Sequence, residues 1–295
     1  MESESRRLPE GELYPQGYDG VTARLVMLQS GINVRIVEAG PPTGHAVVMV
    51  PGWGCGAWIF HEIIPHLGRS GFHAIAVELK GHGLSDKPDD PHEYTGDSMR
   101  DHLGQILDAL GLERAALIGH SMGAAIAVEL TTAAPHRISG LVVAAPVGFA
   151  GVRGMGLFRF ITPRFALPIL QLLATRFLIR AILSMVYGSI RRASKTDVEE
   201  FYWPTRLPGF VRSLRYLLHE FDWAQPFPHL SIPVMTVFGS EDILSPSSDA
   251  GRYGGDPEIV VEGAGHVLFE EAPDILNEAI ARFLSDRVYI SSQDE

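Results

Sequence analysis

Short apolar runs rich in valine and isoleucine recur along the chain and are separated by longer amphipathic stretches. Each run is bounded by glycine, proline or charged residues, a pattern typical of strands in a parallel sheet covered on both faces. The runs lie at residues 46–50, 74–78, 115–118, 141–145, 234–238 and 259–262. Residues 21–29 and 32–38 additionally predict a β-hairpin around Ser30 and Gly31.

Amphipathic helical patterns occupy intervals between these strands. They lie at residues 58–67, 98–110, 122–133 and 273–284. Because strands and helices alternate, the sequence predicts an α/β fold with a mostly parallel, doubly wound sheet. Residues 1–20 are mainly polar and predict a partly ordered leader.

The alternation stops at Pro146, and residues 148–225 carry no convincing strand pattern. This stretch predicts several helices separated by glycine and proline, at residues 158–161, 169–187, 195–202 and 210–220. We therefore expect residues 1–147 and 226–295 to form the core, and residues 148–225 to form an all-helical insertion. Its expected place is over the C-terminal ends of the strands, where ligands bind in open α/β sheets.

The predicted helix at residues 169–187 is unusually apolar. Arg176, Arg180 and Ser184 repeat every four residues and form one polar stripe on it. Two arginines within roughly 19 residues argue against a membrane span. Two interpretations stay open: a helix packed on the core, or a helix whose face lines a lipophilic acyl pocket or touches a membrane surface.

The motif Gly-His-Ser-Met-Gly at residues 119–123 lies between a predicted strand and a predicted helix. In that setting Ser121 occupies a tight, strained turn that lifts its hydroxyl clear of the sheet. A serine hydroxyl becomes a good nucleophile when an imidazole takes its proton and a carboxylate orients that imidazole. A nucleophilic role for Ser121 therefore requires a base and an acid elsewhere in the sequence.

Both partners follow on loops after later strands. Asp242 comes after the run at residues 234–238, and His266 lies in a glycine-flanked loop after the run at residues 259–262. Glu241 and Asp249 are nearby alternatives for the acid, but Asp242 fits best the position of the acid in the α/β-hydrolases, which this order of motifs resembles. His120, inside the serine motif, is expected to serve local packing and hydrogen bonding.

In the order serine, aspartate and histidine, these motifs resemble the serine esterase and lipase branch of the α/β-hydrolase superfamily. Residues 48–54 resemble the strand and turn that supply one oxyanion donor, although Pro51 replaces the usual histidine. Residues 81–88 resemble the loop after the next strand. The resemblance implies an α/β-hydrolase fold in which the helical insertion forms a cap.

The resemblance also implies which groups contact a substrate. The backbone N–H groups of Trp53 and Met122 would form the oxyanion hole. Candidate substrate-contacting side chains are Trp53, Tyr187, Tyr202, Trp203 and Val267. For the three aromatic residues of the cap, core packing is an equally good interpretation.

Composition narrows the range of partners. The chain has 295 residues and a net charge of −11, but residues 148–225 hold 11 basic and 5 acidic residues, a local balance of +6. The acidic remainder argues against general nucleic-acid binding. Cys55 is the single cysteine, which excludes an intrachain disulfide. Because the N-terminus lacks the apolar stretch of a secretory signal, we expect a cytoplasmic protein.

The leading hypothesis is a serine hydrolase that cleaves an ester, thioester or lactone of a small lipophilic acyl substrate, with no cofactor and no metal. His61 and His66 are five residues apart with Pro65 between them, which does not fit a zinc helix. A methyl esterase acting on acyl carrier protein, which would dock its acidic surface on the basic cap, is one alternative. A C–C bond hydrolase, a hydroxynitrile lyase and a non-enzymatic ligand receptor are the others.

Overall fold

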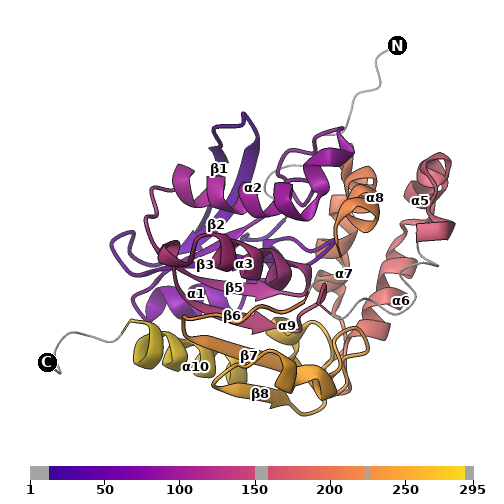
Figure 1. Cartoon of the computed structure of the whole chain (residues 1–295). Coiled ribbons are helices and arrows are strands. Elements are labelled where there is room, and N and C mark those ends of the chain that lie inside the picture. The colour runs from indigo at the N-terminus through magenta and orange to yellow at the C-terminus, as the bar shows by residue number, and fades with distance from the viewer. Residues whose placement is uncertain (1–12, 150–158, 223–225, 290–295) are drawn as a thin grey trace, which may run out of the picture.

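A computed structural model of the chain describes residues 13–149, 159–222 and 226–289 (Figure 1). One sheet contains eight strands in the order β1-β2-β4-β3-β5-β6-β7-β8. The strands are β1 (Val21–Met27), β2 (Asn33–Ala39), β3 (Ala46–Val50), β4 (His73–Val77), β5 (Ala115–His120), β6 (Ile138–Ala144), β7 (Val234–Gly239) and β8 (Glu258–Val261). Strands β3 to β8 run parallel, and the hairpin of β1 and β2 pairs antiparallel with β4.

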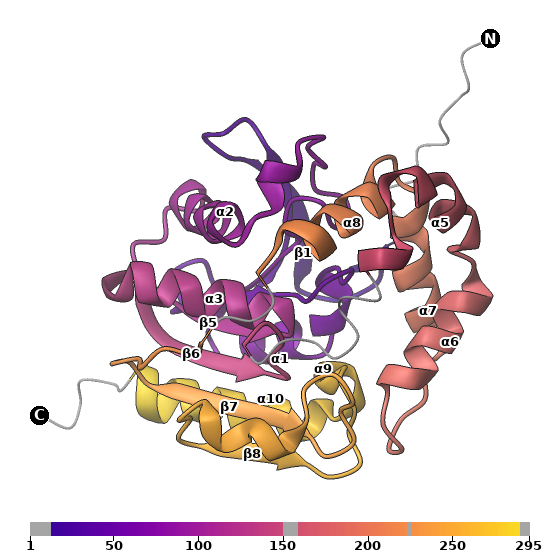
Figure 2. The same cartoon turned by 45° about the vertical axis from the view of Figure 1, so that its right-hand side comes forward.

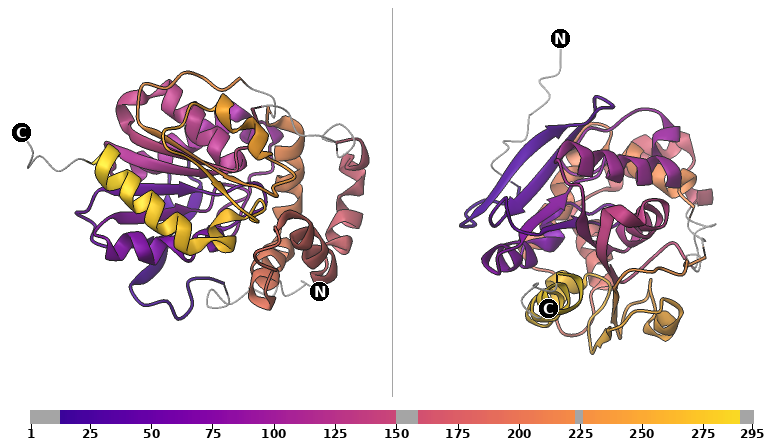
Figure 3. Two further views of the ribbon diagram at one scale, coloured as in Figure 1. Left: turned by 90° about the horizontal axis from the view of Figure 1, so that it is seen from below. Right: turned by 60° about the vertical axis from the view of Figure 1, so that its left-hand side comes forward.

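Helices cover both faces of this sheet (Figure 3). They are α1 (Ile63–Arg69) and α10 (Pro273–Phe283) on one face, and α2 (Gly96–Ala109) and α3 (Met122–Ala133) on the other. Alternate residues of β3 show why both faces need cover: Val47 and Met49 pack with the first pair of helices, and Val48 and Val50 with the second. Two apolar faces on each central strand therefore build two cores, one above and one below the sheet.

The predicted α/β fold is confirmed, with each strand beginning and ending within three residues of the expected position. The helix predicted at residues 58–67 is wrong in its first half. A 3₁₀ turn, Ala57–Phe60, precedes α1, which begins at Ile63. Pro65 accounts for the late start, because proline is tolerated only in the first turn of an α-helix.

The described residues between β6 and β7 form helices and no strands. The helices that follow residues 159–161 are α5 (Leu167–Leu173), α6 (Arg176–Val186), α7 (Lys195–Tyr202) and α8 (Phe210–Glu220). They lie beside the C-terminal ends of the strands (Figures 1 and 2). We call residues 159–222 the cap. Residue 158, where the first of these helices was expected to begin, lies outside the described residues.

The single long helix expected at residues 169–187 is wrong. The chain breaks between α5 and α6, and the two axes, with the 3₁₀ turn Arg164–Ala166 counted in the first, are bent by 93°. Thr175 explains the break, because its side chain accepts a hydrogen bond from the Leu178 N–H and so begins a new helix. The stripe of Arg176, Arg180 and Ser184 therefore lies on α6 alone.

Part of the predicted leader packs against the protein. Tyr14 is 2% exposed and contacts Tyr18 and Trp58 edge to face. Its backbone N–H donates to the Glu200 carboxylate of α7 at 2.9 Å. Residues 13–20 thus join the core and the cap, whereas residues 1–12 lie outside the described residues.

Candidate active site

Ser121 lies in the turn from β5 to α3 with φ 55° and ψ −123°, a conformation that non-glycine residues rarely adopt. The flanking glycines make the turn possible. A Cβ on Gly119 would lie 2.4 Å from the Ala124 Cα, and one on Gly123 would lie 2.2 Å from the Val50 carbonyl oxygen. The local sequence therefore holds Ser121 in a strained turn, as the motif predicts.

The structure brings the three predicted side chains together from three loops. The His266 Nε2 lies 2.9 Å from the Ser121 Oγ, and the His266 Nδ1 lies 2.8 Å from the Asp242 Oδ2. All three residues are at most 6% exposed. These distances are short enough for the imidazole to accept the hydroxyl proton while the carboxylate holds the ring.

Asp242 is held as an anion by its surroundings. Its side chain is fully buried, and burial alone would raise its pKa. The adjacent His266 outweighs burial, together with N–H groups of Leu244 and Ser245 that donate to the Oδ1 at 2.8 and 3.0 Å. The pKa of Asp242 is therefore below its ordinary value, and the carboxylate is ionised at neutral pH.

The two alternative acids point elsewhere. Glu241 is exposed and accepts hydrogen bonds from the Ser189 N–H and hydroxyl, both at 2.7 Å. Asp249 forms an ion pair with Arg252. Neither carboxylate is bonded to the imidazole of His266, so the geometry favours Asp242 as its partner.

The two expected oxyanion donors, the backbone N–H groups of Trp53 and Met122, are free to bind a substrate oxygen. Neither has a hydrogen-bond partner within the described residues. Met122 opens α3, where the first N–H groups lack acceptors within the helix. Gly52, before Trp53, packs directly on the nucleophile, since a Cβ there would lie 2.8 Å from the Ser121 Cβ. A side chain at position 52 would therefore clash with the nucleophile, and only glycine fits there.

Two residues that the motifs did not indicate as site residues hold the loop of His266 from either side. The His120 Nε2 lies 2.8 Å from the His266 carbonyl oxygen, to which it donates, and burial lowers the pKa of His120 to about 3. The Glu271 carboxylate accepts from the N–H groups of Gly265 at 2.9 Å and Val267 at 3.0 Å. The His120 contact joins residues 146 positions apart, so no sequence pattern marks it, whereas Glu271 lies only six and four residues after the two N–H groups that it accepts from.

The predicted substrate-contacting residues fall into different surroundings. Trp53 is 42% exposed, and its indole donates to the Leu214 carbonyl of α8 at 2.9 Å. Val267 is buried next to His266. The rings of Tyr202 and Trp203 lie 5.6 Å apart at a tilt of 55°, and the guanidinium of Arg176 lies over both rings. Tyr187 is 7% exposed and belongs to a buried polar cluster.

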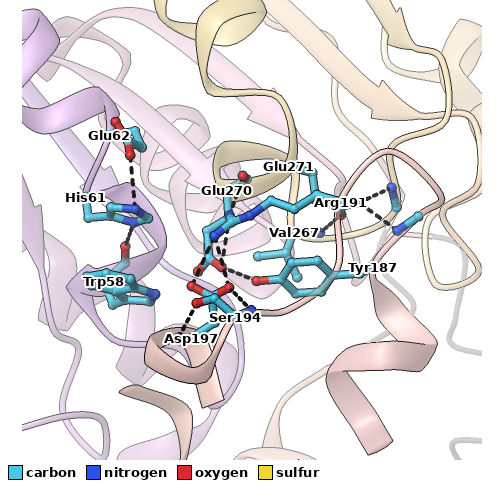
Figure 4. Close-up of polar contacts among 12 residues, drawn as sticks. Trp58, His61, Glu62, Tyr187, Arg191, Ser194, Asp197, Val267, Glu270 and Glu271 are labelled. Carbon is cyan, nitrogen blue, oxygen red and sulfur yellow. Dashed lines mark hydrogen bonds and ion pairs between the residues drawn. The ribbon is translucent and has the colours of Figure 1, made fainter. Parts of the chain in front are cut away.

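This buried cluster joins the cap to the core next to the His266 loop (Figure 4). The Tyr187 hydroxyl donates to the carboxyl of Glu270, which lies on the short helix α9 (Leu268–Glu271). Arg191 pairs with Asp197 at 3.0 Å and also donates to the Glu270 carbonyl oxygen. Burial, followed by the charge of Asp197, raises the pKa of Glu270 to about 8.

Cys55 lies in the turn that borders the site. It is 8% exposed, and burial raises the pKa of its thiol to about 12. A thiol in that state is a small apolar group and not a nucleophile, which agrees with a packing role.

The comparison with protein families agrees with the fold. Residues 45–273, most of the chain, match the family described as alpha/beta hydrolase fold. The chain belongs to this family. Its members share the fold but catalyse different reactions, so family membership alone does not identify the type of bond that this protein cleaves.

The proteins that resemble this member of the family include hydrolases of different kinds. The uncharacterised hydrolase YugF of Bacillus subtilis is 26% identical, over 86% of this chain and 95% of its own. The carboxylesterase CesB of Bacillus subtilis has a TM-score of 0.72 at 19% identity, over 90% and 91% of the two chains. A meta-cleavage product hydrolase of Pseudomonas fluorescens has a TM-score of 0.74 at 21% identity, over 88% and 97%.

Proposed function

We propose that the protein is a serine hydrolase that cleaves a carboxylic ester, thioester or lactone of a lipophilic acyl substrate. The observation that carries the proposal is the continuous hydrogen-bonded chain from the Ser121 Oγ through His266 to Asp242, with distances of 2.9 and 2.8 Å. A serine nucleophile also separates the protein from epoxide hydrolases and haloalkane dehalogenases of the same fold, which need a carboxylate at this position.

In the first half of the reaction the Ser121 Oγ attacks the carbonyl carbon and gives its proton to the His266 Nε2. The carbonyl oxygen becomes an oxyanion and accepts hydrogen bonds from the Trp53 and Met122 N–H groups. One such donor stabilises a transition state by about 3 kcal/mol. Asp242 stabilises the imidazolium, which then protonates the departing alcohol or thiol. The product of this half is an acyl-enzyme on Ser121.

In the second half His266 removes a proton from water, and the resulting hydroxide attacks the acyl carbon. The same two N–H groups hold the second oxyanion. The Ser121 Oγ then leaves and takes back the proton from His266, which restores the free enzyme. Every proton transfer uses the one imidazole, so the water must enter where the first leaving group departed.

The preference for a lipophilic acyl group rests on the cap. Leu183 and Tyr187, near the end of α6, are buried in the core of the protein, and the Val186 carbonyl accepts a hydrogen bond from the His266 N–H at 2.7 Å. An apolar helix is thereby tied to the catalytic loop. We expect an acyl chain that is bound to Ser121 and extends toward the cap to contact apolar side chains.

A panel of p-nitrophenyl esters from acetate to palmitate tests this function. We expect turnover that rises with chain length and is lost in Ser121→Ala, with Ser139→Ala as a matched control. Ser139 is also buried, but its hydroxyl contacts Tyr289 and not the site. Hydrolysis that persists unchanged in Ser121→Ala would contradict the proposal. A wild-type protein that cleaves none of the esters would shift the assignment toward the lyase and the ligand receptor.

A further inference from the structure

Apolar side chains are exposed along α5 and the turn before it. Phe165 is 84% exposed and Leu172 is 76% exposed. Ile169, Leu172 and Leu173 are spaced by three and four residues and so share one face of α5. All three are more than half exposed. This face is therefore apolar, and most of the surface of these side chains is exposed in the described part of the chain.

The next helix also exposes apolar side chains. On α6, Leu178, Ile182 and Met185 follow one another at intervals of four and three residues and are 39%, 42% and 63% exposed. Phe177, beside them, is 82% exposed. Leu183 is the only residue of α6 that is buried. In a water-soluble protein such stripes normally face the core. Helix α6 therefore packs one face on the protein and exposes a second apolar face that could contact a binding partner.

We call the eight exposed residues together the apolar cap surface. They are Phe165, Ile169, Leu172, Leu173, Phe177, Leu178, Ile182 and Met185. Figure 2 shows α5 and α6 at the outer edge of the molecule, on the side away from the sheet. An apolar surface contributed by two successive helices is larger than the scattered exposed residues of ordinary proteins and indicates a binding partner.

The charged residues around this surface indicate the chemistry of its partner. No aspartate or glutamate occurs between Glu129 and Asp197, a stretch that includes α5 and α6. Arg164, Arg180 and Arg192 are exposed there, and within the described residues their guanidinium groups form no hydrogen bond and no ion pair. Unpaired cations around an exposed apolar surface match a layer that is anionic at its surface and apolar beneath it.

We propose that the apolar cap surface binds the surface of a lipid bilayer that contains anionic lipids, with α5 and α6 lying in the interface. In the described part of the chain no single helix is long and apolar enough to cross a membrane. The pair formed by residues 164–173 and 176–186 has the composition of a span but is bent by 93°. Such a bend suits two short helices at the level of the lipid headgroups and does not suit a straight span.

Two other occupants fit the surface less well. A symmetric dimer through this surface would bring the unpaired arginines of both copies into one interface, and like charges oppose that contact. An acidic carrier protein would match the arginines, but a polar, acidic partner would leave Phe165 and Phe177 without an apolar contact. A bilayer with anionic lipid satisfies both features at once.

Binding there would bring lipid to the catalytic site. The last residue of α6, Val186, accepts the hydrogen bond from the backbone N–H of His266. A lipophilic substrate dissolved in the bilayer would therefore enter next to the helix that is tied to the catalytic loop. This last step rests on the proposed function, whereas binding to the bilayer does not.

Flotation with vesicles tests the binding. All proteins carry Ser121→Ala, so that hydrolysis cannot alter the lipids, and vesicles are either pure phosphatidylcholine or contain 30 mol% phosphatidylglycerol. The test variant is Phe165→Ser/Leu172→Ser/Phe177→Ser. Its matched control is Leu25→Ser/Met27→Ser/Ile275→Ser, which replaces residues that are 54%, 70% and 54% exposed away from the cap.

We expect the parent protein and the control to float with the anionic vesicles, and the test variant to partition at least about 10-fold more weakly. Arg164→Gln/Arg180→Gln/Arg192→Gln should weaken binding to the anionic vesicles by a similar factor and leave binding to phosphatidylcholine unchanged. Circular dichroism checks that each variant is folded.

Three results would overturn the proposal. The first is a parent protein that floats with neither vesicle, and the second is a test variant that floats as well as its control. A dimer in sedimentation velocity that the test variant converts to monomer would assign the surface to a second copy. None of these results depends on catalysis, so failure here leaves the ester hydrolase proposal intact, and failure of the ester panel leaves the bilayer proposal intact.

Discussion

Glu270 should make the stability of the protein depend on pH in a direction opposite to that of most carboxylates. Its side chain is fully buried in a cluster that also holds the carboxylates of Asp197 and Glu271, with Arg191 as the neighbouring cation. Three carboxylates near one guanidinium favour a proton on one of them. Glu270 is the one whose pKa is raised to about 8, first by burial and then by Asp197.

The sign and size of the effect follow from linkage. Because the folded pKa is above the unfolded value of 4.5, the folded protein keeps a proton that the unfolded chain releases. The contribution of Glu270 is therefore fully present below pH 4.5 and is lost as the pH rises through about 8. At 1.36 kcal/mol per pH unit, the loss is roughly 3–5 kcal/mol of unfolding free energy.

Urea unfolding at pH 5, 6, 7 and 8 measures this loss. Glu270→Gln keeps the shape and the acceptor for the Tyr187 hydroxyl but cannot ionise, so we expect its unfolding free energy to fall less with pH than that of the wild type. The gap between the two proteins should change by roughly 3–5 kcal/mol across the range. Glu278→Gln, at a side chain that is 74% exposed, is the matched control and should run parallel to the wild type. Parallel curves for Glu270→Gln would refute the reasoning.

Two further substitutions test how the catalytic histidine is held. Glu271→Gln turns an amide N–H₂ toward backbone N–H groups beside His266. We therefore expect kcat for the best ester of the panel to fall on the order of 10–100-fold, with little change in KM. An unchanged kcat would show that Glu271 does not position His266. Asp242→Asn should lower kcat by about 10⁴-fold, because an asparagine favours the wrong tautomer of His266. Full activity in that variant, or an equal loss in Glu241→Gln, would assign the acid to another residue.

The fold could be predicted from the sequence because its information is local. The alternating faces of β3, for example, require apolar residues at every position from Ala46 to Val50, and this run is visible without any tertiary contact. The nucleophile turn is equally local, since Gly119 and Gly123 are required by clashes within the turn and with the adjoining strand. Both features can therefore be recognised in a single sequence.

The break in the cap helix and the support of His266 could not be derived in the same way. The apolar periodicity at residues 169–187 continues through the break, so hydrophobicity alone predicted one helix; only Thr175, as a helix-capping residue, marked the interruption. The bond from His120 to the His266 carbonyl joins residues 146 positions apart. Such contacts depend on how loops from different strands meet at the edge of the sheet.

The central claim is that Ser121 is a nucleophile activated by His266, and its most direct test is covalent capture. The protein is incubated with a fluorophosphonate and analysed by intact mass and peptide mapping, alongside Ser121→Ala and His266→Gln. The account predicts one adduct per chain on Ser121, none in Ser121→Ala and much slower capture in His266→Gln. A wild-type protein that stays unlabelled under conditions that label a known serine esterase, or an adduct on a different residue, would contradict it.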